Sequence, residues 1–249
     1  MQPLREGGSL PALAEANDGM KYVIKFKGSG HGTKTLIAEL LGGEIARALG
    51  LNVPELVFAE LDESFGRTEG DQEIQDLLKA SKGLNLGLCF LPGAFAYDPV
   101  VTRLDPLTAS QIVWLDSFIA NADRSFQNTN MLFSNRKLWL IDHGSCLFYH
   151  YKWEAWEDKA TAPFQYIKTH VLLSQATRLE EADRVCRSLI DENKLRDIVA
   201  LIPDEWINWQ TPVESRNLVR IKYFNFLSRR LNYSKQFIKE ALNAAKTLI

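Results

Sequence analysis

The chain has 249 residues, 46% of them apolar, and its 29 basic and 31 acidic side chains give a formal net charge of −2. This composition excludes a disordered chain and suits one large domain or two lobes around a buried core. The balanced charge argues against a protein that binds nucleic acid or membranes through its overall charge. The three cysteines lack metal-ligand spacing. The sequence also has no signal-peptide core and no apolar run long enough for a membrane span. Together these features predict a cytoplasmic protein.

The first part of the chain, residues 1–91, is predicted to be rich in strands. Its β-branched and aromatic apolar runs predict strands at residues 22–26, 53–61 and 84–91. One helix is expected from about residue 35 to 49, where apolar residues recur at helical spacing before a glycine. A surface loop with a short helix near residues 73–80 is expected in the charged segment 62–82. Lys25 lies inside the first strand, and because an isolated buried ammonium is costly, it needs an anionic partner.

The second part, residues 92–249, is predicted to be mainly helical after a break at Pro92-Gly93. Asp105 as N-cap and Pro106 as first helical residue start a helix that runs to about residue 120. Short strands are expected at residues 130–133 and 138–141, and further helices at 164–175, 178–189, 192–201 and 213–246, with a break near Asn232 as an alternative for the last one. Strands followed by helices predict an α+β protein of two lobes.

Two carboxylates and an amide flank the predicted hairpin. Asp123 follows the helix, Asn128 stands five residues later, and Asp142 comes directly after the apolar strand and before His143 and Gly144. Alone, each of these residues fits ordinary turn chemistry. Together they form the set that phosphoryl transfer needs, in which one carboxylate engages the attacking hydroxyl while an amide and a second carboxylate hold a metal. The sequence therefore favours a phosphotransferase.

The D-R-x-x-x-N loop at 123–128 and the I-D-H-G sequence at 141–144 resemble those of the HipA-like kinases, and more distantly of phosphatidylinositol kinases and aminoglycoside phosphotransferases. The YVIKF run resembles that group's lysine strand, and residues 38–55 resemble its first-lobe helix and following strand. The resemblance implies a two-lobed protein-kinase-like fold, with a small β-rich N-lobe holding one main helix and a larger helical C-lobe. The chain departs from the family's commoner pattern at Ser125, where a histidine is usual, and at His143, where many relatives have an aromatic residue.

The resemblance also implies roles for individual residues. Asp123 would be the catalytic base or orienting carboxylate, and Arg124 would orient its loop or contact phosphate, unless it is a surface arginine. Asn128 and Asp142 would bind Mg²⁺, and Lys25 would contact the phosphates of ATP. A turn formed by Gly7, Gly8 and Ser9 would cover the phosphates through backbone N–H groups, with an ordinary surface turn as the alternative.

The resemblance also implies a helical glutamate as the partner of Lys25, and two candidates stay open for it. The family pattern selects Glu39. Helical geometry at about 100° per residue instead places Glu44 on the apolar face and Glu39 on the opposite one. Both residues are therefore candidates for the ATP site.

The resemblance implies an ATP- and Mg²⁺-dependent kinase that phosphorylates a serine or threonine hydroxyl on a protein, such as a translation factor, and that has an antitoxin-like partner. Neither direct nucleic-acid binding nor a membrane is expected. Three alternatives remain: a small-molecule or lipid kinase on the same fold, a non-catalytic nucleotide-binding module, and a P-loop NTPase that uses Gly28–Thr35. The P-loop pattern requires glycine before Lys34, and Thr33 stands there.

Overall fold

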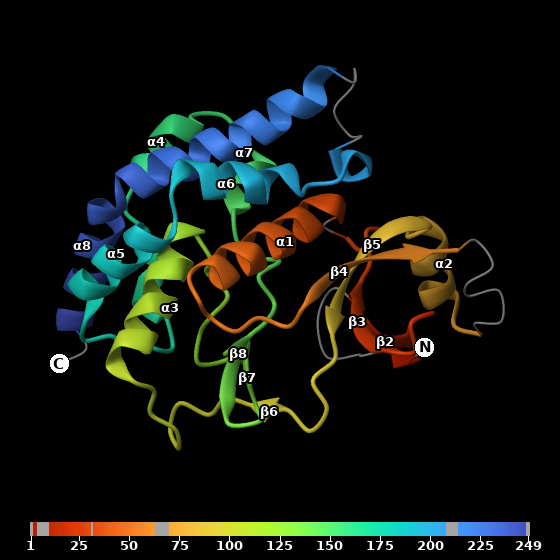
Figure 1. Ribbon diagram of the computed structural model, residues 1–249, viewed down its shortest axis with the longest axis horizontal. Helices are drawn as coiled ribbons and strands as arrows, with labels where there is room; N and C mark the ends of the chain where they lie inside the picture. The colour runs from red at the N-terminus through yellow and green to blue at the C-terminus, as the bar shows by residue number, and fades with distance from the viewer. Residues whose placement is uncertain (1, 4–9, 31, 63–69, 208–213, 248–249) are drawn as a thin grey trace.

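The computed structural model describes residues 2–3, 10–30, 32–62, 70–207 and 214–247 (Figure 1). A five-stranded sheet lies at one end and a layer of helices at the other, with helix α1 (Gly32–Ala48) between them. Within the described ranges, no helix has both the length and the apolar character that a membrane crossing requires.

The sheet of the first lobe is antiparallel throughout its described pairings and has the order β1-β2-β3-β5-β4. Its strands are β1 (Gln2–Pro3), β2 (Ala12–Glu15), β3 (Lys21–Lys25), β4 (Leu56–Leu61) and β5 (Gly83–Cys89). Side chains alternate between the two faces of β3, so Tyr22 and Ile24 face away from Lys25. They pack against Ile74 and Leu78 of helix α2 (Gln72–Ala80), which begins at the N-cap Asp71.

A cavity of about 520 Å³ opens on that outer face of the sheet, with Tyr22, Ile24 and Val57 among its lining residues. None of the proposed site residues lines it. Because Lys25 points to the opposite face, this cavity is separate from the site described below.

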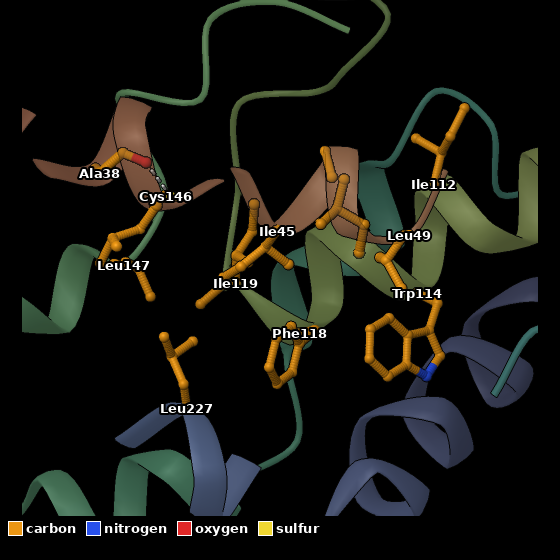
Figure 2. Packing of buried hydrophobic residues seen from close by; sticks show 14 of the residues in the cluster. Ala38, Ile45, Leu49, Ile112, Trp114, Phe118, Ile119, Cys146, Leu147 and Leu227 are labelled. Atoms are coloured by element: carbon orange, nitrogen blue, oxygen red, sulfur yellow. Dashed lines mark hydrogen bonds between the residues drawn. The ribbon is translucent and has the colours of Figure 1, made fainter. Parts of the chain in front are cut away.

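Helix α1 is buried on nearly all sides, because the sheet covers one side and the helical lobe the others. Ile45 of this helix and Leu49 just after it lie in the main hydrophobic core together with Trp114 and Phe118 of helix α3 (Pro106–Phe118) (Figure 2). The helix begins at Gly32, whose φ of +64° suits glycine, three residues before the predicted start.

The second lobe combines a small sheet with helices. The sheet has the order β6-β7-β8, with β6 (Phe95–Ala96), β7 (Met131–Ser134) and β8 (Lys137–Leu140). Helices and 3₁₀ turns make up the rest: η1 (Phe148–Tyr151), α4 (Trp156–Thr161), η2 (Gln165–Thr169), α5 (Leu179–Leu189), α6 (Glu192–Ala200), η3 (Asp204–Ile207), α7 (Glu214–Asn232) and α8 (Ser234–Lys246).

The structure confirms the α+β fold with a strand-rich first lobe and a helical second lobe, but it corrects one helix. The predicted helix 164–175 is the 3₁₀ turn η2 followed by turns, where His170 forms an isolated β-bridge with Ser125. Backbone pairing with another loop replaces helical hydrogen bonds there. The segment predicted as a helix over 213–246 forms two helices, α7 and α8, which meet at Tyr233, beside the break expected near Asn232.

The turn η3 joins the helical lobe to the start of β5. The side chain of Trp206 is fully buried, donates from Nε1 to the carbonyl of Leu84 at 2.9 Å and meets Phe58 edge-on. Glu205 accepts a hydrogen bond from the Leu84 N–H and pairs with Lys27. A Cβ on Gly83 would lie 2.6 Å from the Glu205 carboxylate, so glycine is required for this close approach.

Replacing Trp206 with alanine is expected to lower the free energy of unfolding by about 3–5 kcal/mol, because a large cavity would form between the lobes. Urea unfolding followed by circular dichroism measures this change. Val101→Ala is the control, since Val101 is 80% exposed and its truncation is expected to change stability by less than about 0.5 kcal/mol. Equal stability of the Trp206→Ala and Val101→Ala variants would contradict the importance of this contact.

Candidate active site

A buried ion-pair cluster lies between the sheet and helix α1. Lys25 of β3 donates from Nζ to Glu39 Oε2 of α1 at 2.7 Å and also pairs with Asp142 Oδ1. Burial alone would lower the pKa of Lys25, but the two carboxylates outweigh it and raise this pKa above its usual value. Burial would raise the pKa of Glu39, but the Lys25 ammonium outweighs it and holds this pKa below its usual range. The lysine is therefore charged and held by two anions.

Asp142 follows strand β8 in a left-handed backbone conformation with φ +57°. This conformation is uncommon for residues other than glycine, although aspartate tolerates it better than most. It turns the chain at the strand end so that Asp142 meets Lys25. Two residues later, a Cβ on Gly144 would lie 2.7 Å from Thr35 Cγ2, so glycine lets this loop approach α1.

The Asp123 carboxylate is held by side chains from two loops. Oδ2 accepts hydrogen bonds from Asn128 Nδ2 at 3.2 Å, Asn130 Nδ2 at 3.3 Å and Ser145 Oγ at 3.4 Å. Ser145 stands three residues after Asp142, so this last contact joins the Asp123 loop to the Asp142 loop. The structure thus brings Asp123, Asn128, Asp142 and Lys25 into one site.

The donor set at this site suits a hard cation. Asn128 turns its amide nitrogen to Asp123, which leaves its amide oxygen available as a ligand, and the Asp142 carboxylate is half-exposed. In the described part of the chain, no group of three or more His, Cys, Asp or Glu side chains is arranged to hold a metal ion. Mg²⁺ fits nonetheless, since it binds through one or two protein oxygens and takes its other ligands from water and phosphates.

A fully buried network of hydrogen bonds around Asp116 holds the Asp123 loop in place. Asp116 of α3 accepts hydrogen bonds from Arg124 Nε at 2.6 Å, His170 Nε2 at 2.8 Å and Asn121 Nδ2 at 2.8 Å. His170 Nδ1 accepts from a backbone N–H, so the ring proton lies on Nε2. Burial would raise the pKa of Asp116, but Arg124 and His170 outweigh it and lower this pKa.

This network supports the loop-orienting role among the roles predicted for Arg124. Its side chain is fully buried and also donates to the carbonyls of Thr129 and Asn130. It is therefore neither a surface arginine nor placed to contact a phosphate, and it orients the loop. His150 and His170 are both buried, with at most 5% of each residue exposed.

The remaining predicted site residues have different outcomes. Glu44 forms an ion pair with Arg47 on the same helix, so the placement of Glu44 as the partner of Lys25 was wrong. That argument assumed one apolar face, whereas α1 is covered on both sides and Glu39 is fully buried. Gly7, Gly8 and Ser9 lie outside the described residues, and their role stays a prediction.

The P-loop alternative conflicts with the fold. A P-loop lies between a strand and a helix of an α/β unit with parallel strands, while every described pairing of β3 is antiparallel. Lys34 lies in the first turn of α1, donates to the carbonyl of His150 at 2.9 Å and lies over the ring of Tyr151. Its described contacts are therefore with the segment after Gly144.

Several residues that shape the site were missed at the sequence level. They are Asp116, Asn121, Asn130 and Ser145. Asp116 carried a usable signal, because one charged residue in the apolar run IVWLDSFIA indicates a buried, paired carboxylate. The other three are polar loop residues, for which the sequence alone does not distinguish turn chemistry from contact with Asp123.

Comparison with known proteins agrees with this geometry. The family model described as HipA-like kinase matches residues 1–238.

The chain belongs to the HipA-like kinase family.

A solved structure, that of a proinflammatory kinase CtkA from Helicobacter pylori, resembles this HipA-like kinase with a TM-score of 0.56 over 99% of this chain and 94% of the other. Sequence identity to CtkA is 14%, so the likeness shows the shared kinase fold. A search of curated proteins finds no match. As a HipA-like kinase with a two-lobed α+β fold, the protein is a phosphotransferase.

Proposed function

We propose that this HipA-like kinase transfers the γ-phosphoryl group of ATP, with Mg²⁺, to a serine or threonine hydroxyl on a protein. The observation that carries the proposal is the joining of Lys25, Glu39 and Asp142 to the Asp123 loop through Ser145. This arrangement supplies the lysine–glutamate ion pair, the metal carboxylate and the carboxylate for the hydroxyl that protein kinases use.

The residues then act in distinct ways. Lys25, held by Glu39, presents its ammonium to the phosphates of ATP, where it stabilises negative charge in a partly buried site. Bound Mg²⁺ would neutralise charge on the phosphates, and Asn128 with Asp142 would hold it. Asp123 accepts the proton of the acceptor hydroxyl. Its carboxylate is kept in place by Asn130 and Ser145.

An exposed aromatic side chain supports a protein acceptor. Phe126 stands three residues after Asp123 and is 63% exposed, although burial is favourable for a side chain of this size. In a protein kinase it offers a contact surface for a bound peptide next to the carboxylate.

The three cysteines are free thiols, which fits a reducing compartment such as the cytoplasm.

The role of Lys25 can be tested against that of Lys34. Lys25→Met is expected to lower ATP turnover by roughly 100-fold or more, because it removes a charge aimed at the transferring group. Lys34→Met is the matched control and is expected to retain most of the turnover. Release of ADP in the presence of Mg²⁺ measures both variants. A loss confined to Lys34→Met would instead support the P-loop alternative.

Serine or threonine specificity needs a separate measurement. Phosphopeptides in cells that express the wild-type chain are compared with those in cells that express Asp123→Asn. The proposal expects phosphoserine or phosphothreonine sites that appear only with the wild type. Identical phosphopeptides together with wild-type turnover of ATP would indicate a small-molecule or lipid acceptor.

A further inference from the structure

His143 lies at the centre of the site without a hydrogen bond in the described structure. It directly follows Asp142, is fully buried, and neither ring nitrogen has a hydrogen-bond partner among the described residues. An unpaired buried polar group lowers stability by about as much as a lost hydrogen bond. A side chain that only fills space at this position would be expected to be apolar. The buried imidazole of His143 therefore needs a further explanation.

Helix α1 is shaped to receive this ring. A Cβ on Gly42 would lie 2.7 Å from His143 Cβ and 3.2 Å from its Cγ, so only glycine lets the imidazole approach the helix this closely. Cys146 holds the same loop against α1 by donating from Sγ to the Ala38 carbonyl at 3.3 Å (Figure 2). His143 is therefore fixed beside α1 by packing on two sides.

The group that His143 faces is Glu39. Oε2 of Glu39 accepts from Lys25, while Oε1 is buried and has no hydrogen-bond partner among the described residues. His143 Nδ1 lies 3.7 Å from this Oε1, slightly beyond hydrogen-bond distance. The two unpaired atoms are complementary, because a neutral imidazole can donate from Nδ1 and a carboxylate oxygen can accept.

We propose that His143 is a positioning residue that donates from Nδ1 to Glu39 Oε1 when ATP is bound. This inference rests on the proposed function. In the structure Lys25 is shared between Glu39 and Asp142. When ATP draws Lys25 from Asp142 toward the phosphates, Glu39 has to follow its partner. A small shift closes the gap to Nδ1, and the new hydrogen bond fixes Glu39 and thereby Lys25 in the position for phosphate contact.

Three variants separate the hydrogen bond from packing. The amide nitrogen of His143→Asn stands near the place of Nδ1, whereas that of His143→Gln stands near the place of Nε2. His143→Phe fills the space without a donor. Isothermal titration calorimetry with a non-hydrolysable ATP analogue and Mg²⁺ measures affinity, and no acceptor is needed. We expect His143→Phe and His143→Gln to bind roughly 10-fold more weakly, as for one lost hydrogen bond to a charged group, and His143→Asn to recover most of the affinity.

Two further measurements exclude a general folding effect. Thermal unfolding without nucleotide identifies variants that have lost structure. The effect of His143→Phe is then measured again in a Glu39→Met background, which has no acceptor for Nδ1, and it should largely disappear if His143 acts through Glu39. Additive effects of the two changes, or equal affinity of the His143→Asn and His143→Gln variants, would overturn the positioning role.

The outcome also distinguishes this inference from the proposed function. If the wild type binds the analogue and His143→Phe binds it equally well, only the role of His143 is overturned. If the wild-type protein does not bind the analogue with Mg²⁺, the proposed function fails, and the role of His143 fails with it.

Discussion

Replacing Asp142 or Asp123 with asparagine is expected to reduce phosphoryl transfer by about 10²- to 10⁴-fold, the range typical of a lost catalytic acid–base group. Under the proposed function, the Asp142→Asn variant lacks the charge that would hold the metal, and the Asp123→Asn variant lacks the basicity that would engage the acceptor hydroxyl. Both substitutions preserve side-chain shape, so the fold should persist. Incorporation of labelled phosphate into protein, together with ADP release, measures the loss for each variant.

Asp197→Asn provides a matched control, since Asp197 is an exposed aspartate on helix α6. It should leave phosphoryl transfer unchanged. Lys25 keeps Glu39 as its partner in the Asp142→Asn variant, so the unfolding temperature should change little. Wild-type turnover in both site variants would show that the Asp123 and Asp142 loops are not the catalytic site.

Replacing Asp116 with asparagine is expected to destabilise the protein by about 3–5 kcal/mol, because it leaves the buried Arg124 guanidinium without its counter-ion. The side chains of both residues are fully buried. The change also loosens the Asp123 loop, so turnover should fall together with stability. Denaturant unfolding at pH 7 measures the free energy, and Asp76→Asn on the surface of α2 is the control.

The contribution of Asp116 to folding stability should decrease as the pH falls. Because the folded-state pKa of Asp116 is lowered, its contribution to stability is complete above the unfolded-state pKa of about 4 and is lost as the pH falls below it. The stability difference between wild type and Asp116→Asn should therefore shrink below about pH 4. A difference that stays constant from pH 7 to pH 3 would contradict a charged Asp116 in the folded protein.

Much of the fold follows from local patterns in the sequence. The strand around Lys25 and the helix that starts after Asp105 depend on side-chain alternation and on capping, which local sequence records. The region around His170 does not. Its backbone pairs with Ser125, almost fifty positions earlier, and no local pattern encodes such a long-range contact.

The site residues also divide into those that local sequence identifies and those that only the three-dimensional structure identifies. Asp123, Asn128 and Asp142 could be named in advance because their spacing carries chemistry, and the structure brings them together. Glu39 and Glu44 could not be separated by helical periodicity, since that argument needs to know how many sides of α1 are covered. The function of Arg124 depended on Asp116, and their pairing is visible only in three dimensions.

The burial of α1 determines how its glutamate can move. Ile37, Leu41 and Ile45 are fully buried in the core that α1 shares with the helical lobe. Exposing each would cost about 1.5–3 kcal/mol, so an outward swing of the whole helix would cost more than most effectors can supply. In protein kinases, displacement of the corresponding helix is a common means of inactivation. In this protein the burial of α1 opposes such a displacement, so the hydrophobic core keeps the Lys25–Glu39 ion pair assembled.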